Sequence, residues 1–222
     1  MPLMLTEELV LCCEGEADRQ FLRKMTEKRR LPKFDMPFPT EKLHGNGAFG
    51  GMLEAIRGNK RHFPRIKGVL IVADSTEHPD ILFQNLCEQI RELGGYGIPS
   101  RLADVGRADG HPAVGVMTLP DEKTPGALET LLAEEMTTKR PWIGTCVDAF
   151  LRCDKVDAHG WPAEKRDKAR FHSMVAVLNR DDPSKAASWA FKDPTPLIAV
   201  EASCFNGVER RIREFCAAVG AI

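Results

Sequence analysis

The chain has 222 residues, enough for one domain with a full hydrophobic core and a helical appendage, and its 43% hydrophobic and 28% charged residues are ordinary for a soluble globular protein. The formal net charge of −1 excludes an overall basic surface, so any site for nucleic acid has to come from local patches of charge. The 7 cysteines include no CxxC pair, which argues against a zinc site. No apolar segment is long enough to span a bilayer, which argues against a membrane protein. We therefore predict a cytoplasmic protein with reduced thiols.

The first predicted strand is the apolar run at residues 9–13, which stops at Glu14 and a glycine. A charged segment follows, and the helical spacing of its apolar residues predicts a helix over residues 18–30. Ligands of open α/β sheets bind at the carboxyl ends of the strands. Glu14 is therefore expected at a ligand-binding edge, where a carboxylate that ends a buried strand needs a partner.

The next segments lead to a second buried strand. Residues 32–39 alternate apolar side chains with prolines, which fits an edge strand. The glycine cluster at residues 44–51 matches neither GxGxxG nor a Walker loop, so it is interpreted as a tight turn into a helix. The apolar run at residues 68–73 then ends at Asp74. If the two strands are neighbours, the carboxylates of Glu14 and Asp74 meet at one edge of the sheet and suggest a magnesium site.

The rest of the first two thirds continues to alternate strands and helices. The elements expected are, in order, a helix that is capped at residues 75–79 and closed by Gly94 and Gly95, a loop at 100–112, a strand at 113–119, a turn at 120–126 and a helix from 127. After residue 142 the pattern is mainly helical. We therefore predict an α/β fold with a mostly parallel sheet flanked by helices over residues 1–140, and a helical region over 141–222 that packs on it.

Two further carboxylates lie where acids also have ordinary structural roles. Asp18 stands at the start of the first predicted helix, where an aspartate commonly caps the helix. Glu129 lies in the first turn of a later helix, where the helix dipole favours an acid. Metal binding and helix stabilisation are both open for these two residues.

Three motifs in this order carry a resemblance to a known family. They are EGxxDxxFL at Glu14 to Leu22, an apolar strand ending in an acidic motif at Val69 to Glu77, and PxxxxPGxLExLL at Pro120 to Leu132. Their order resembles the TOPRIM domain of topoisomerases and primases, and most of all small stand-alone TOPRIM-like proteins and the nucleases of the overcoming-lysogenization-defect (OLD) family. The resemblance covers about the first two thirds of the chain and extends to the basic residues of 167–170.

The resemblance implies a Mg²⁺- or Mn²⁺-dependent nuclease, a hydrolase of phosphodiester bonds, in phage defence or DNA metabolism. By this resemblance the catalytic residues are Glu14, Asp74 and Lys168, with Lys168 as the electrophile on the scissile phosphate. The implied metal ligands are Glu14, Asp18, Asp74, Thr76 and Glu129, with Asp121 as a weaker candidate. The second motif departs from the usual DxD, because Thr76 supplies a hydroxyl and no charge.

Positive charge for nucleic acid, with DNA preferred over RNA, has to come from local clusters. The residues taken as nucleic-acid contacts are Lys24, Arg61, Arg65 and Arg170, although such clusters are more often solvated faces. No Walker motif is present, so an ATPase partner would be a separate chain. A homodimer is left open.

Two other functions compete with the nuclease. The first is a TOPRIM-like fold whose site has decayed and which acts as a binding or regulatory subunit of an ATPase-containing complex, an alternative that Thr76 favours. The second is a flavodoxin-like or receiver-type domain in which Glu14 and Asp74 bind one magnesium ion.

Overall fold

The computed structural model describes residues 4–37, 49–75, 78–157, 159–179, 181–184, 187–191 and 196–222. Its centre is a sheet with the strand order β1-β2-β4-β3. The strands are β1 (Leu9–Cys13), β2 (Gly68–Asp74), β3 (Val105–Gly106) and β4 (Ala113–Leu119). β1, β2 and β4 run parallel, and β3 pairs antiparallel with β4. The predicted α/β fold with a mostly parallel sheet is confirmed.

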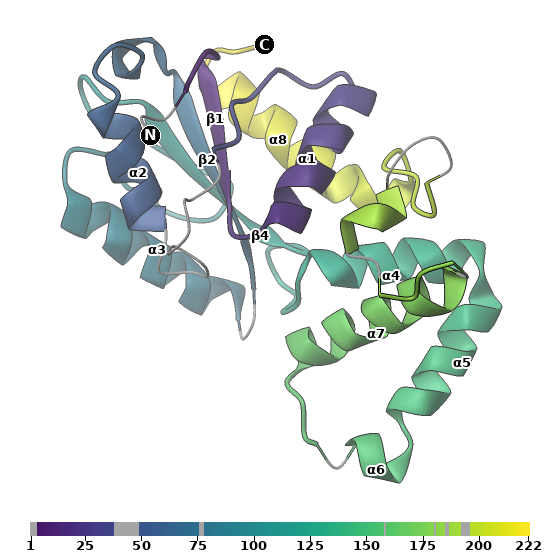
Figure 1. Cartoon of the computed structure of the whole chain (residues 1–222). Coiled ribbons are helices and arrows are strands. Elements are labelled where there is room, and N and C mark those ends of the chain that lie inside the picture. The colour runs from purple at the N-terminus through teal and green to yellow at the C-terminus, as the bar shows by residue number, and fades with distance from the viewer. Residues whose placement is uncertain are drawn as a thin grey trace.

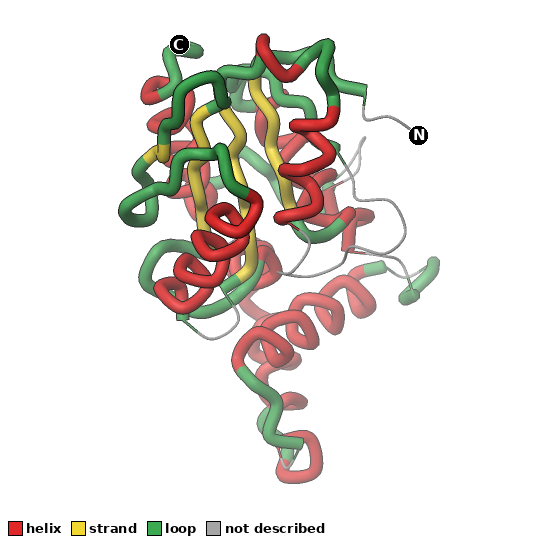
Figure 2. Tube along the Cα trace, turned by 90° about the vertical axis from the view of Figure 1, so that its left-hand side faces the viewer, coloured by secondary structure: helices red, strands yellow, loops and turns green. Residues whose placement is uncertain are grey.

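Helices cover both faces of the sheet (Figure 1). The α-helices are α1 (Glu16–Lys28), α2 (Phe49–Gly58), α3 (Pro79–Leu93), α4 (Leu128–Lys139), α5 (Pro141–Leu151), α6 (Asp154–Asp157), α7 (Ala163–Leu178) and α8 (Asn206–Ala218), with short 3-10 turns η2 (Phe63–Arg65), η3 (Ala187–Phe191) and η4 (Ser203–Phe205). Figure 2, turned by 90°, shows the strands side by side with a group of helices beyond one end of them. None of the helices in the described ranges is long and apolar enough to cross a membrane.

The strands are apolar on both sides because each side of the sheet has its own core. Alternate residues such as Leu11 and Val72 belong to a cluster shared with α1, α4, α7 and α8. The residues between them, such as Cys12 and Ile71, pack with α2 and α3. Continuous apolar runs are typical of parallel strands that are buried on both faces, which explains why β1, β2 and β4 could be identified as short apolar runs without a period of two.

The last helix, α8, lies directly on the sheet. A Cβ atom at Gly68 or Gly115 would come within 2.7 Å of the Phe215 ring, so the two glycines on neighbouring strands make room for this side chain. Phe215 and Ile212 are buried in the same core as the strand residues. The region 141–222 therefore shares its core with the sheet, and the boundary placed at residue 140 does not separate two cores.

Two segments differ from their expected form. The segment at residues 100–112 contains the two-residue strand β3, which is too short for a periodic pattern and exists because it pairs with β4. The proline-rich segment is described as far as residue 37, and there it forms one parallel bridge between Asp35 and Val10 beside the edge of β1. Most of the glycine cluster at 44–51 lies outside the described residues.

Candidate active site

Two acids meet at the carboxyl ends of β1 and β2. The parallel register pairs Cys13 with Val72, so the residues that follow emerge at the same rim of the sheet. The Oε1 atom of Glu14 accepts a hydrogen bond from the backbone N–H of Asp74 at 3.2 Å. The structure thus brings together the two carboxylates that the sequence places at strand ends. We call this edge, with the acids gathered there, the acidic rim.

The start of α4 adds a third acid to the acidic rim. The Oδ1 atom of Asp74 accepts a hydrogen bond from the backbone N–H of Leu128 at 3.0 Å, which fixes the first turn of α4 against β2. The loop before α4 is also tied down, because the N–H of Gly126 donates to the Ser75 carbonyl at 2.6 Å. Glu129 in this first turn is only 8% exposed, and its Oε2 atom has no hydrogen-bond partner among the described residues.

Asp18 has both of the roles that its position allows. Its Oδ2 atom accepts a hydrogen bond from the backbone N–H of Gly15 at 2.9 Å, as in a helix cap. Burial, followed by the negative charges of Asp74 and Glu129, raises the pKa of Asp18 to about 8. A residue that only capped an exposed helix would not be affected by those two acids, so Asp18 also belongs to the acidic rim.

Lys168 of α7 places a positive charge among these acids. Its Nζ atom lies 3.4 Å from Asp74 Oδ2 and forms an ion pair with Glu164, four residues earlier on the same helix. Burial lowers the pKa of Lys168, but the hydrogen bond to Glu164 and the charges of Asp74 and Glu129 outweigh it, so the pKa lies above its ordinary value. Lys168 therefore carries a full positive charge at the acidic rim.

Glu164 is a member of the acidic rim that the sequence analysis missed. Its side chain is 16% exposed, and its charge contributes to the raised pKa values of Glu14 and Glu129. The one available signal was the spacing of four residues before Lys168, which pairs a glutamate and a lysine on one helical face. That spacing is common on solvated helices and did not indicate which way the pair faces.

A hydrogen-bonded chain positions α7 against α4. The hydroxyl of Thr130 accepts from the N–H of Ala127 at 3.1 Å and donates to Asp167 Oδ2 at 2.6 Å. Asp167 precedes Lys168 directly. The start of α4, which holds Glu129, is thus joined to the turn of α7 that holds the lysine.

Burial and mutual repulsion raise the pKa values of Glu14, Asp74 and Glu129. Burial raises the pKa of Glu14 to about 7, with a further contribution from the charge of Asp74. Burial also raises the pKa of Asp74 to about 6, and the charge of Glu129 adds to this shift while Lys168 opposes it. Burial likewise raises the pKa of Glu129. One ammonium group therefore does not compensate the charge of the acidic rim.

The donor set fits a hard divalent cation. Mg²⁺ and Mn²⁺ prefer oxygen ligands, and one or two carboxylates suffice when water and substrate complete the shell. The buried, unpartnered Oε2 of Glu129 and the raised pKa of Glu14 are what a cation would relieve. As the side chains stand in the described residues, no three His, Cys, Asp or Glu groups converge on one point that could hold a metal ion. Binding a metal would therefore require the acids to rearrange around it.

Of the two other candidate ligands, only Asp121 belongs to the described residues. Thr76 lies outside the described residues. The Oδ1 atom of Asp121 accepts hydrogen bonds from the backbone N–H groups of Lys123 and Thr124 at 2.7 and 2.9 Å, so this carboxylate is engaged within its own loop.

The four residues expected to contact nucleic acid are not gathered at the acidic rim. Arg61 and Arg65 precede the first residue of β2 and so lie toward the amino ends of the strands, opposite the acidic rim. Lys24 donates a hydrogen bond to the carbonyl of Phe191. Arg170 donates to both carboxylate oxygens of Asp148, at 2.6 and 3.0 Å. Lys24 thus joins α1 to the C-terminal region, and Arg170 joins α7 to α5 within that region.

The chain was compared with known proteins. A family model described as "Protein of unknown function (DUF3226)" matches residues 8–198. No curated protein and no solved structure matches the chain.

Proposed function

The chain belongs to the family described as "Protein of unknown function (DUF3226)", and we propose that it is a divalent-metal-dependent enzyme that cleaves phosphodiester bonds in nucleic acid. The observation that carries the proposal is the hydrogen bond that joins Glu14 to Asp74 across two neighbouring parallel strands, with Lys168 at 3.4 Å from the second acid. Carboxylates and a lysine at one rim are the groups that metal-assisted phosphoryl chemistry requires.

Each residue of the rim has a role in this proposal. Glu14, Asp18, Asp74 and Glu129 would hold Mg²⁺ or Mn²⁺. The ion would supply Lewis-acid activation of a water molecule and of the scissile phosphate. Lys168 neutralises charge on the phosphate oxygens, and its pairing with Glu164 keeps the ammonium group at the rim between reactions.

The resemblance to the TOPRIM and OLD-type nucleases extends the proposal beyond the site. It favours DNA over RNA, a cytoplasmic location, a role in phage defence or DNA metabolism, and an ATPase on a separate chain as a partner. A homodimer is compatible with it.

A second candidate is a regulatory or binding subunit with the same fold and no catalysis. Two observations favour it. Thr76 replaces the second acid of the usual DxD motif. In addition, Lys168 already contacts Asp74 Oδ2, an oxygen that a metal would use.

The test measures Mn²⁺ binding and DNA cleavage by the purified full chain. We expect Glu14→Ala and Asp74→Ala each to weaken Mn²⁺ binding by about 10- to 100-fold or more and to reduce cleavage to background. Glu54→Ala is the control, because this acid is exposed on α2 and lies outside the acidic rim. Metal binding without cleavage by the wild-type chain would favour the regulatory subunit. Cleavage that survives both substitutions would remove the proposal.

A further inference from the structure

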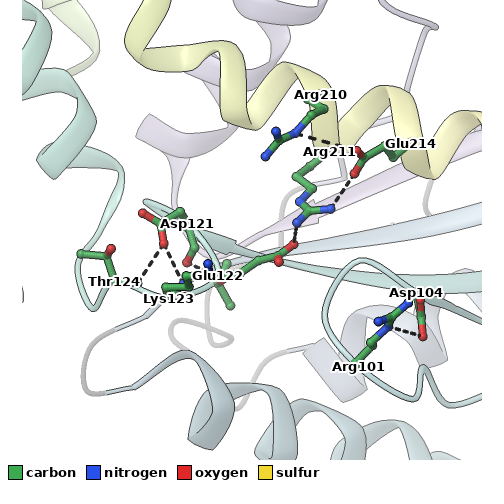
Figure 3. A network of polar contacts seen from close by, with 10 residues as sticks. Arg101, Asp104, Asp121, Glu122, Lys123, Thr124, Arg210, Arg211 and Glu214 are labelled. Carbon is green, nitrogen blue, oxygen red and sulfur yellow. Dashed lines mark hydrogen bonds and ion pairs between the residues drawn. The ribbon is translucent and has the colours of Figure 1, made fainter.

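A second site lies beside the acidic rim, between α8 and the loop that follows β4 (Figure 3). It is a cavity of about 440 Å³, within the usual range for small-molecule sites. The lining residues come from the end of β4, from residues 120–124 and from the first turns of α8. None of the acids of the rim lines it, so its chemistry can be considered separately.

Both acids of this cavity already have partners within the protein. Glu122 forms an ion pair with Arg211, and Arg211 also donates to Glu214 at 2.6 Å. Figure 3 shows Arg211 reaching from α8 to Glu122. The Asp121 carboxylate accepts two backbone hydrogen bonds within the loop. These bonds stabilise the ionised form of Asp121, whose pKa lies below its ordinary value, so this acid keeps its charge. The lining nevertheless holds three cations, Lys123, Arg210 and Arg211, against its two acids.

Two cations of the lining remain available to bind an anionic group. The side chain of Arg210 is 67% exposed, and its ion pair with Glu214 is long, at 3.8 Å. Lys123 is exposed and forms no ion pair with the described residues. Such solvent-exposed groups can turn to an incoming anion at little cost, because a long surface ion pair contributes little. The available charge of the cavity is therefore positive.

The rest of the lining combines apolar side chains with Thr118 and Thr124 and leaves room for a ring. Met117, Pro120 and Val208 supply apolar surface. Gly207 also lines the cavity, and a Cβ atom built on it would meet no other atom within 4 Å. An inorganic anion would use the cations and leave this surface unused. A ligand with an apolar planar part and an anionic group would use both.

We propose that this cavity binds a nucleoside monophosphate, with the base against Met117, Pro120 and Val208 and the phosphate at Lys123 and Arg210. The nucleotide can be free, or it can be one unit of a single strand that reaches the site. The inference goes beyond the proposed phosphodiester cleavage and does not depend on it, because no acid of the rim takes part.

The test is calorimetric titration of the full chain in EDTA, so that metal chemistry cannot contribute. The ligands are the ribo- and deoxyribonucleoside monophosphates, a short single-stranded oligonucleotide and inorganic phosphate. We expect at least one nucleotide or the oligonucleotide to bind, and phosphate alone to bind at least about tenfold more weakly. Saturation by free nucleotides indicates a small-molecule site, and binding of the oligonucleotide alone indicates a strand site; either supports the proposal.

Matched variants locate the binding. Gly207→Trp should fill the cavity and abolish binding, while Gly207→Ala should retain it. The double variant Lys123→Gln with Arg210→Gln should weaken binding by about tenfold or more, and Arg91→Gln, which removes an exposed cation on α3, should not. Three results would each overturn the inference. The first is no binding up to about 1 mM ligand. The second is phosphate that binds as tightly as nucleotides, and the third is binding that is unchanged in both Gly207→Trp and the double variant. Glu14→Ala should bind nucleotide as wild type does even if it loses metal, which keeps this test apart from that of the nuclease.

Discussion

At neutral pH, the burial of single acids in the acidic rim lowers the free energy of unfolding of the metal-free protein. Glu14 and Asp18 have ordinary pKa values of 4.5 and 3.8, and burial together with neighbouring acids raises these to about 7 and about 8. The folded chain therefore binds protons more tightly than the unfolded chain does. A group of this kind stabilises the fold fully below its unfolded pKa, and the contribution is lost as the pH rises through its folded pKa.

This linkage predicts how stability depends on pH without metal. In EDTA the free energy of unfolding should fall by at least about 1 kcal/mol between about pH 5 and about pH 8. Chemical unfolding at a series of pH values measures it. The double variant Glu14→Gln with Asp18→Asn should flatten the profile, and excess Mg²⁺ should restore stability at the upper end. A wild-type profile that is already flat in EDTA would contradict the assigned electrostatics.

Lys168 should matter most when no metal is bound. Lys168→Met removes the ammonium group that lies 3.4 Å from Asp74 Oδ2 and leaves the acids to repel one another. Because this side chain is 37% exposed and partly screened, we expect a loss of about 1 kcal/mol in EDTA. Thermal melts with and without Mg²⁺ measure the difference, which saturating metal should reduce. An equal loss in both conditions would mean that Lys168 supports the fold and not the charge balance of the rim.

At the scale of elements, Arg29 after the end of α1 anchors the C-terminal segment. Its guanidinium donates to the Val200 carbonyl at 2.8 Å and to Asn206 Oδ1 at 2.9 Å, and it pairs with Glu209. The Arg29 side chain is only 7% exposed. These contacts fix the start of α8 next to α1, and so determine where α8 crosses the sheet.

Removing this anchor should be costly because the carbonyl of buried Val200 and the half-buried Glu209 would lose this donor. Arg29→Met should lower the free energy of unfolding by about 3 kcal/mol, since a carboxylate and carbonyls lose a shared donor. Arg29→Lys should fall between this variant and wild type, because an ammonium group cannot reproduce the forked geometry. Arg101→Ala is the control: this side chain is 81% exposed and pairs with Asp104, so the change should be below about 1 kcal/mol. Urea unfolding compares the three, and a similar small effect at both sites would refute the anchoring role.

For the whole molecule, the helical region and the sheet depend on one another. Phe215 of α8 occupies the space above Gly68 and Gly115, and Phe171 of α7 is fully buried in the same core as β1. A chain that ends at residue 140 would keep α1 and α4 on this face of the sheet but expose the part of the core that α7 and α8 cover. Burial of apolar surface is the main favourable contribution to folding, so the first 140 residues lack the area that they need.

The fragment 1–140 should therefore not fold by itself. We expect it to bind ANS and to lose its near-UV circular dichroism while retaining some secondary structure. A chain shortened only by Ile222, which is 67% exposed, is the control and should unfold cooperatively as wild type does. A fragment with a sharp, cooperative thermal transition would show instead that residues 1–140 are an independent domain.

Much of the fold could be predicted because its signals are local. The runs that form β1, β2 and β4 are buried on both faces, so their sequences alone identify them as strands, and the cap at His78 and Pro79 and the turn at Gly94 mark the limits of α3. The placement of Glu14 and Asp74 at one rim followed from the rule that neighbouring parallel strands end together. That rule required only that β1 and β2 be neighbours, which they are.

The tertiary structure alone decided which residues of the helices face the acids at the strand ends. Periodicity shows which side of a helix is apolar, but not where that helix lies on the sheet, because packing between segments far apart in the chain depends on shapes and charges that no local window contains. Three features therefore appeared only in the folded chain. Lys168 pairs with Asp74, and Glu164 joins the acidic rim. Arg61 and Arg65 lie toward the amino ends of the strands. The sequence by itself determined the strands and the acids at their ends; the packing of α4, α7 and α8 determined what those acids face.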